Sequence, residues 1–414
     1  MEVPGEGRYH GVHASGAVSS PRRVRSPSGS ESQVRSLQIV YAFDNRVPSP
    51  QADTEQLVST VAALSRRDLD LCLLVPDLGG RTSGPELCQY YGVQGPFRVS
   101  HFPGLGWARV PQKLWAPVRV ARADEVAGAD LIYTRNLPIA LALTALGRRV
   151  VLDTYRPWPG QYPALRPLLR WLMRSPSFVG GILHSELARR AYLETGIPDG
   201  KLLVAHNGFE PSRMEPVMAP KEAREKLGLD PGRPTVVYAG RIGGDKGLDV
   251  VLETARRCPG VRFLFVGATG RDPFEEECRA VPNMELISWK PFDELSAWLY
   301  AADVLLVPPS EEPLLEKGHT VLPMKLFAYL AAGRPILAGA SPDVRELLVD
   351  RENAILVPPG DAGAATAALT ELLADEELRA RLARGAARTA GGLTWDARAE
   401  RIHEFLLERL GRMG

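Results

Sequence analysis

Two successive series of short, β-rich apolar runs alternate with amphipathic helical segments, and this alternation is the strongest constraint on the fold. The first series starts at Leu37 and the second at Thr235. Such alternation is typical of βαβ units, in which consecutive strands run parallel and a helix forms each crossover. The sequence therefore predicts an α/β protein with two parallel sheets in tandem. The predicted strands are LQIVYAF, LDLCLLV, LIYTRN, RVVLDT, GGILHS and LLVAHNG, then TVVYAG, FLFVGA, MELISW, VLLVPP, PILAG and AILVPP.

The length of the chain, 414 residues, also favours two domains over one core. Residues 1–35 are rich in Ser, Gly, Pro and Arg and are predicted to be a disordered leader. Residues 36–213 and 214–393 are predicted to form the two sheet domains, because a Pro-rich, charged segment lies between the series. Residues 394–414 should form a helix that docks on the body through Trp395, Ile402, Phe405, Leu406 and Leu410.

Composition restricts the class of protein. A formal net charge of +1, with 24% charged and 45% hydrophobic residues, gives no bulk electrostatic reason to bind nucleic acid. No run approaches the roughly 20 apolar residues of a membrane span. The four cysteines, and His184, His206 and His319, show no metal-ligand spacing. We therefore expect a cytoplasmic protein without a metal or cofactor.

Cationic residues follow one strand of the second series at a glycine-rich turn. In GRIGGDKGLDVVLETA, Arg241 comes directly after the strand, Gly243 and Gly244 free the backbone, and Lys246 is expected to open the next helix. Cations beside a helix N-terminus favour an anionic ligand. A tight turn with two solvated charges is the alternative. Open α/β sheets bind ligands at the carboxyl ends of their strands, which places this turn in the predicted cleft.

A second such turn occurs in TVLPMKLFAYLAAGRPILA. Pro323 is expected to begin a helix, and Lys325 then lies in its first turn, beside amides that lack helical partners. Only eight of the 50 Lys and Arg residues are lysines. Two of these eight lie at such turns, which favours phosphate binding over a chance surface charge. An amphipathic core helix with Lys325 in water is the alternative.

These segments resemble a known family. GRIGGDKGLDVVLETA, LISWKPFDELSAWLYAADVLLVPP and PMKLFAYLAAGRPILA resemble, in order and spacing, the C-terminal half of glycosyltransferase family 4 enzymes (glycosyl transferases group 1). LLVAHNGFEPSRMEP is similar to the family's linker entry, and LQIVYAFDNRVPSPQADTEQLVSTVAAL to its first strand, acceptor loop and helix. The resemblance implies a GT-B fold, in which two Rossmann-like parallel-sheet domains face each other across a cleft.

The resemblance also implies a function. A retaining glycosyltransferase of the hexosyl type would move a sugar from a nucleotide-diphosphate donor to a glycan, lipid-linked or small-molecule acceptor without a metal. The N-terminal domain would bind the acceptor and the C-terminal domain the donor. Arg241 and Lys246 would stabilise the departing diphosphate. The implied donor-binding residues are Gly240, Gly243, Gly244, Trp289, Thr320, Met324, Lys325, Leu326 and Ala328, and the acceptor-side residues are Asp44, Asn45, Tyr155 and Arg156.

The sequence departs from the family pattern at two points. The family commonly carries two glutamates, with seven residues between them, that contact the donor sugar and ribose, whereas the corresponding positions here are Thr320 and Ala328. The family also places a histidine after an N-terminal-domain strand, where VVLDTYRPWPG offers Asp153, Tyr155 and Arg156. A catalytically inactive GT-B binding subunit and a nucleotide-sugar epimerase are therefore the alternative functions.

One helical segment leaves peripheral membrane contact open. LRPLLRWLMRS, residues 165–175, carries Arg166, Arg170 and Arg174 at four-residue spacing beside leucines and a tryptophan. Such a helix could rest on an anionic membrane that holds a lipid-linked acceptor. We favour the alternative, in which its apolar face packs in a core.

Overall fold

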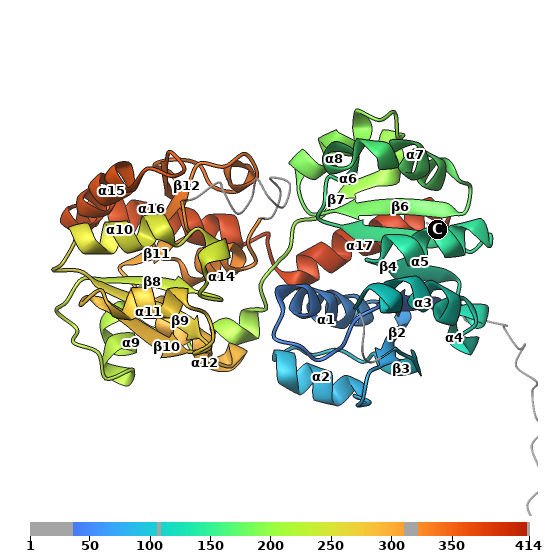
Figure 1. Cartoon of the computed structure of the whole chain (residues 1–414), viewed down its shortest axis with the longest axis horizontal. Coiled ribbons are helices and arrows are strands. Elements are labelled where there is room, and N and C mark those ends of the chain that lie inside the picture. Colours follow the sequence, from blue (N-terminus) through green and yellow to red (C-terminus); the bar gives the residue numbers. More distant parts are fainter. Residues whose placement is uncertain (1–35, 106–108, 310–321, 412–414) are drawn as a thin grey trace, which may run out of the picture. The chain divides into compact units, whose positions relative to one another are not determined.

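The computed structural model describes residues 36–105, 109–309 and 322–411, without the side chains of residues 109, 110, 292 and 293. Thr320 and His319 lie outside this part of the chain. Two parallel sheets form, one in each half of the sequence (Figure 1). The predicted α/β class with two Rossmann-like sheets is therefore confirmed.

The first sheet has seven strands in the order β3-β2-β1-β4-β5-β6-β7, and every neighbouring pair is parallel. From β1 the chain adds β2 and β3 on one side and then β4 to β7 on the other, so β1 and β4 flank the topological switch point of the sheet. Open α/β sheets bind ligands at such a point. The strands are β1 (Leu37–Ala42), β2 (Leu69–Asp77), β3 (Arg98–Pro103), β4 (Leu131–Thr134), β5 (Val150–Thr154), β6 (Phe178–Leu183) and β7 (Leu202–Val204).

The second sheet has six strands in the order β10-β9-β8-β11-β12-β13, again all parallel. Its switch point lies at β8, whose carboxyl end leads into the glycine-rich turn. The strands are β8 (Thr235–Ala239), β9 (Arg262–Ala268), β10 (Met284–Ser288), β11 (Val304–Leu306), β12 (Ile336–Gly339) and β13 (Ile355–Val357).

Helices make the crossovers between strands, as right-handed βαβ geometry requires. In the first half they are α1 (Ala52–Ser65), α2 (Gly84–Tyr91), α3 (Arg109–Ala121), α4 (Asp124–Gly128), α5 (Leu137–Ala145), α6 (Trp158–Gln161), α7 (Arg166–Arg174) and α8 (Glu186–Leu193). Beyond them come α9 (Pro220–Lys226), α10 (Asp249–Arg257), α11 (Phe274–Arg279), α12 (Phe292–Tyr300), α14 (Lys325–Ala332), α15 (Ala362–Ala374), α16 (Glu376–Ala390) and α17 (Trp395–Arg409). Short 3₁₀ turns are η1 (Pro163–Leu165), η2 (Asp199–Lys201), η3 (Pro211–Met214), η4 (Gly244–Lys246) and η5 (Val344–Glu346).

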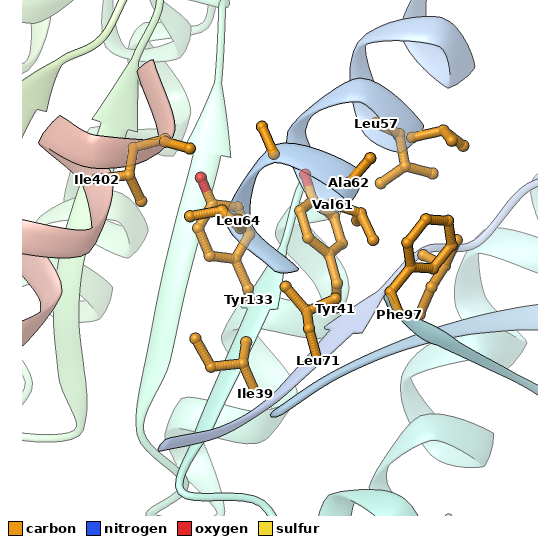
Figure 2. Packing of buried hydrophobic residues seen from close by; sticks show 14 of the residues in the cluster. Ile39, Tyr41, Leu57, Val61, Ala62, Leu64, Leu71, Phe97, Tyr133 and Ile402 are labelled. Carbon is orange, nitrogen blue, oxygen red and sulfur yellow. The ribbon is translucent and has the colours of Figure 1, made fainter. Parts of the chain in front are cut away.

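Hydrophobic clusters cover both faces of each sheet, because strands buried on two sides carry apolar residues at consecutive positions. In the first sheet, alternate residues of β1 divide between two clusters: Ile39 and Tyr41 lie in one, Val40 and Ala42 in the other. Figure 2 shows the first of these clusters, with Tyr41 and Tyr133 from neighbouring strands packed beneath α1. Their rings stack with centroids 4.6 Å apart.

Helix α17, which follows α16, packs on the first sheet. Thr394 caps it by accepting a hydrogen bond from the Ala397 amide. Trp395, Ile402 and Leu406 are buried in the cluster that also contains β1 and α1 (Figure 2), and Phe405 and Leu410 pack against that cluster. The helix carries Arg398 into the same interior, where it is 3% exposed.

The structure contains one strand that the sequence pattern does not predict. β3, RVSHFP, is an edge strand in which only Phe102 is buried. Its mixture of polar and apolar residues follows from its position, because an edge strand pairs on one side only and needs no continuous apolar run. The twelve predicted runs all form strands.

Helix α7 corresponds to the segment for which a membrane-surface role was the alternative. Its apolar face, Leu169, Leu172 and Met173, is buried in the core. Its arginines donate to backbone carbonyls: Arg166 to Pro159, Arg170 to Thr195 and Arg174 to Gly196. Leu168 and Trp171 remain exposed. In the described part of the chain, no helix combines the length and apolar character that a membrane crossing needs.

Candidate functional site

The glycine-rich turn after β8 holds two of the predicted catalytic cations. Gly240, with φ of 139°, ends the strand in a conformation that L side chains rarely adopt, and Arg241 follows. Lys246 lies in the 3₁₀ turn η4, and α10 begins only at Asp249. The expectation that Lys246 begins the helix is therefore wrong, because α10 begins three residues later. Gly247, which takes a left-handed conformation, separates the 3₁₀ turn from the helix.

Arg241 and Lys246 converge on one carboxylate. Arg241 Nη2 lies 2.5 Å from Asp245 Oδ1, and Lys246 Nζ lies 3.4 Å from Asp245 Oδ2. Arg241 Nη1 is also 3.6 Å from Asp272 Oδ2. The Arg241 side chain is 49% exposed and that of Lys246 34%. Exposed pairs of this kind contribute little to stability, so an anionic ligand can displace the carboxylate at small cost.

Lys325 supplies a third cation from the neighbouring crossover. It begins α14, and its Nζ lies 3.5 Å from the centroid of the Tyr238 ring on β8. Desolvation, followed by the positive charge of Lys246, holds the pKa of Lys325 well below its usual value. Among the described residues no carboxylate pairs with this ammonium group. The tyrosine ring stabilises the ammonium group less than an anion does, so most of the positive charge of Lys325 is not compensated.

Glycines allow the three cations to approach one another. A Cβ atom at Gly240 would lie 2.8 Å from Lys325 Nζ, and one at Gly243 would lie 2.8 Å from Arg241 Nη1 and 2.7 Å from Asp272 Oδ2. Gly244 has no neighbour within 4 Å of a Cβ position, so its surroundings are open. Any other residue at Gly240 or Gly243 would therefore place a side chain against the cation cluster.

Helix α14 begins two residues later than the sequence pattern predicts. Pro323 precedes it, and the amides of Leu326 and Phe327 donate to the carbonyls of Pro323 and Met324, so they are not free for an anion. The side chain of Leu326 is fully buried, which leaves only its backbone for ligand contact. Ala328 is half-buried against the core of the second half. Thr320 lies outside the described residues.

The remaining predicted donor residue, Trp289, follows β10 and is 44% exposed. Its backbone amide donates to the carbonyl of Ala268 at the end of β9. β9 lies between β10 and β8 in the sheet, so Trp289 lies at the same sheet edge as the cation cluster.

The predicted acceptor-side residues lie at the carboxyl ends of β1 and β5. Asp44 is buried and accepts from Asn136 Nδ2 at 2.5 Å, and burial raises the pKa of its carboxyl group. Asn45 is exposed. Tyr155 and Arg156 pair with each other: the Arg156 Nε donates to the Tyr155 hydroxyl at 3.1 Å. All four residues therefore lie at the carboxyl edge of the first sheet.

The structure identifies a residue that the sequence pattern did not single out. His184 follows β6 and lines a pocket of about 150 Å³. Tyr155 lines the same pocket, its ring centroid 6.1 Å from that of His184. Leu322 and Met324, which immediately precede Lys325, line it as well. A histidine directly after a strand and before a helix-capping serine, Ser185, was the available signal.

A buried charged network lies behind His184. Its Nε2 is 2.5 Å from Asp153 Oδ1, and Asp153 Oδ2 accepts from Tyr133 at 2.8 Å and from Arg398 at 3.0 Å. Although burial opposes it, the charge of Arg398 and the His184 hydrogen bond hold the pKa of Asp153 far below its usual range. Burial lowers the pKa of His184 to about 4, so the imidazole is neutral at pH 7.

The segment of the chain that holds the cation cluster is similar to a known family. Residues 220–389 match the family model described as Glycosyl transferases group 1. The matched segment, 170 of the 414 residues, is similar to that family. Arg241, Lys246 and Lys325 all lie within the part that matches the glycosyl transferases group 1 model.

Curated relatives are glycosyltransferases as well. The chain is 32% identical over 200 residues to a D-inositol 3-phosphate glycosyltransferase of Xylanimonas cellulosilytica, covering 46% of each chain. It is 29% identical over 193 residues to the lipopolysaccharide core biosynthesis glycosyltransferase LpsE of Rhizobium meliloti, covering 46% of this chain and 49% of the relative. The sulfoquinovosyl transferase SQD2 of Arabidopsis thaliana is 26% identical over 341 residues, covering 76% of this chain and 63% of the relative. The chain spans about half the length of the first curated relatives that it matches.

Solved structures extend the agreement to both halves of the fold. Sucrose-phosphate synthase of Thermosynechococcus elongatus superposes with a TM-score of 0.73 over 91% of this chain and 100% of that one, at 16% identity. Alr3699/HepE of Anabaena, in complex with UDP and glucose, gives a TM-score of 0.68 over 90% and 100%, at 18% identity. At these identities the likeness is one of fold, and that fold, two Rossmann-like parallel sheets, is GT-B.

Proposed function

We propose that this chain is a retaining glycosyltransferase that uses a nucleotide-diphosphate sugar. One observation carries the proposal: Arg241, Lys246 and Lys325 gather at the end of β8, and Lys325 has no carboxylate partner among the described residues. A diphosphate is the ligand whose charge suits such a cluster. Residues 214–393 would then bind the donor and residues 36–213 the acceptor.

In the proposed reaction the bond from the anomeric carbon to the diphosphate oxygen breaks. A bond from the same carbon to an acceptor hydroxyl oxygen forms on the same face, and the hydroxyl proton leaves with the departing diphosphate. Negative charge grows on that diphosphate in the transition state. Fixed cations stabilise this charge more than the ground state, which is what accelerates the chemical step. Arg241, Lys246 and Lys325 are the residues in this role.

The finer features of the proposal come from the family resemblance and the relatives. A UDP-linked hexose is the first donor to test, because the related HepE structure contains UDP and glucose. Charge stabilisation by side chains suits a metal-independent reaction. The acceptor is a glycan, a lipid-linked sugar or a small polyol. A lipid-linked acceptor would bring the chain to a membrane surface, where exposed Leu168 and Trp171 on α7 would be available for contact.

The proposal is tested by incubating the full chain with UDP-, GDP-, ADP- and TDP-hexoses, together with a panel of polyol and sugar acceptors. We expect one donor to release its nucleoside diphosphate and to give a glycoside of the same anomeric configuration. An isomerised nucleotide sugar would instead identify an epimerase. Donor binding without any product would identify a non-catalytic subunit, and both results contradict the proposal.

The lowered pKa of Lys325 predicts a pH dependence of donor binding. The bound diphosphate places negative charge beside the ammonium group and raises its pKa, so the complex binds more protons than the free protein, by up to about one. Affinity for UDP should therefore fall as the pH rises through the Lys325 pKa of the free protein. Calorimetric titrations in buffers of different ionisation enthalpy measure the proton uptake directly.

The Lys325→Met variant is the control for this measurement. It removes the titrating group, so the part of the proton uptake that belongs to Lys325 should disappear. An unchanged uptake in Lys325→Met would assign the linkage to another group and contradict the placement of the diphosphate.

Restoring the family's glutamate at Ala328 should tighten donor binding. Ala328 lies one turn into α14 and is half-buried, so a carboxylate there can reach a ribose beside the cation cluster. Charge-assisted hydrogen bonds to ribose hydroxyls are worth about 1.5 to 3 kcal/mol, or roughly ten- to a hundredfold in affinity. Calorimetry with UDP on wild type and Ala328→Glu gives the answer, with Ala328→Gln as the uncharged control. Weaker binding in Ala328→Glu would overturn this placement of the ribose.

A further inference from the structure

The pocket beside His184 is lined by polar groups that are almost completely buried. Gln56, His184 and Asn207 are 3%, 4% and 5% exposed, and all three line the pocket. Asn207 Oδ1 has no hydrogen-bond partner among the described residues. A buried acceptor without a partner is unfavourable unless a ligand or water donates to it. The pocket therefore offers a buried acceptor to a ligand hydroxyl group or to a water molecule.

His184 is held in one orientation within this pocket. Because its imidazole is neutral, the 2.5 Å contact with ionised Asp153 requires Nε2 to carry the proton and to donate it. Nδ1 is then unprotonated and accepts a hydrogen bond. The side-chain nitrogen of Gln56 lies 2.8 Å from Nε2 and 3.4 Å from Nδ1. Because Nε2 carries the proton, the Gln56 amide can donate only to Nδ1, in a long contact that a ligand hydroxyl can replace. Asp153 thus fixes both the tautomer and the ring.

Asp153 in turn depends on the last helix of the chain. Arg398 of α17 donates to Asp153 Oδ2 at 3.0 Å, to Thr60 Oγ1 of α1 at 3.2 Å and to the Ala205 carbonyl after β7 at 3.3 Å. The guanidinium group therefore joins α1, β5 and the end of β7. Hydrophobic packing of α17 through Ile402 and its neighbours determines where Arg398 lies (Figure 2).

We propose that Arg398 is a positioning residue that acts through Asp153 on His184, and that His184 accepts a hydrogen bond from a hydroxyl of a sugar ring in this pocket. The inference rests on the proposed glycosyl transfer and adds to it a residue from the far end of the chain, 245 positions from Asp153. A purely structural ion pair is the competing explanation. The two differ in whether the effects of Arg398 and His184 on turnover are independent.

The test is a double-mutant cycle on the full chain, with His184→Ala, Arg398→Met and the double variant. Turnover is measured as release of UDP from UDP-glucose, or from the donor that the panel selects. We expect each single change to lower turnover by about tenfold or more, as loss of a hydrogen bond to a reacting ligand does. The double variant should be no slower than His184→Ala alone, because Arg398 acts only through His184. Losses that multiply in the double variant would overturn the proposal.

Two further variants keep the test decisive. Arg401→Met is the matched control, because Arg401 is exposed on the same helix and donates to the Val204 carbonyl; it should retain wild-type turnover. Arg398→Lys preserves the charge in Asp153's surroundings and should restore the fold and part of the turnover if Arg398→Met unfolds. A contradicting result is that Arg398→Lys folds and turns over as fast as wild type while His184→Ala is slow. The guanidinium group would then not be needed to hold His184 in place.

The source of the sugar ring is resolved by two binding measurements. If the ring belongs to the donor, His184→Ala and Arg398→Met lose the affinity that UDP-glucose has beyond UDP, while UDP itself binds as in wild type. If it belongs to the acceptor, the same variants lose binding of methyl α-glucoside to the UDP-bound protein, measured by saturation-transfer NMR. Loss in neither measurement contradicts the proposal. Failure of the wild type to bind any of the four nucleoside diphosphates of the donor panel would instead refute the proposed function.

Discussion

Arg241→Ala and Lys246→Ala should each lower the turnover of the donor by about 100- to 1000-fold, the usual effect of removing a group that stabilises transition-state charge. Both side chains reach solvent and pair with Asp245 in exposed geometry, so neither change should lower the melting temperature by more than a few degrees. Steady-state kinetics and thermal unfolding on the same preparations measure the two effects.

The control for these variants is Arg256→Ala. Arg256 is 53% exposed on α10, in the same half of the chain, and pairs with Glu253 at 3.7 Å. Its loss should leave turnover unchanged, because it is not part of the cation cluster. If Arg241→Ala and Lys246→Ala also retain wild-type turnover, the donor diphosphate does not bind at the end of β8.

Lys325→Met should have opposite effects on stability and on donor binding. The ammonium group is desolvated, faces the charge of Lys246 and has no carboxylate partner among the described residues, so an apolar side chain of similar length should raise the melting temperature. The same change removes a charge-assisted hydrogen bond to the diphosphate. UDP affinity should then fall by roughly ten- to a hundredfold. Thermal unfolding and calorimetry with UDP measure the pair of effects.

Lys226→Met, on an exposed position of α9, is the control for the loss of a lysine. It should change neither the melting temperature nor the UDP affinity appreciably. A Lys325→Met variant that is less stable than wild type and binds UDP normally would show that Lys325 serves the fold and not the ligand.

Much of the fold could be predicted from the sequence because buried parallel strands leave a clear pattern. Runs such as LDLCLLV and FLFVGA are apolar at consecutive positions, and helices cover both faces of their sheets. β3 was missed for the opposite reason: an edge strand with one buried residue carries no such pattern. The start of α14 was misplaced because Pro323 fits either side of a helix N-terminus.

The candidate site divides in the same way. Arg241 and Lys246 were expected in one site because they lie in the turn after β8, and Lys325 because it lies in the first turn of a helix; the structure brings Lys325 next to this turn, and their binding of an anion stays a prediction. The network of Asp153, His184 and Arg398 could not be predicted, because its members come from β5, the end of β6 and α17. A buried aspartate within a strand and an arginine on a helix carry no local pattern, and only the tertiary packing of α17 brings them together.

The account depends most directly on where the diphosphate of the donor binds. A crystal structure of the full chain with the nucleoside diphosphate that stabilises it most in a thermal-shift panel tests this point. We predict that the β-phosphate lies within hydrogen-bond distance of Lys325 Nζ and contacts Arg241 and Lys246 at the end of β8. A nucleotide bound with its phosphates away from these three residues, or no binding by any nucleoside diphosphate, would contradict the account.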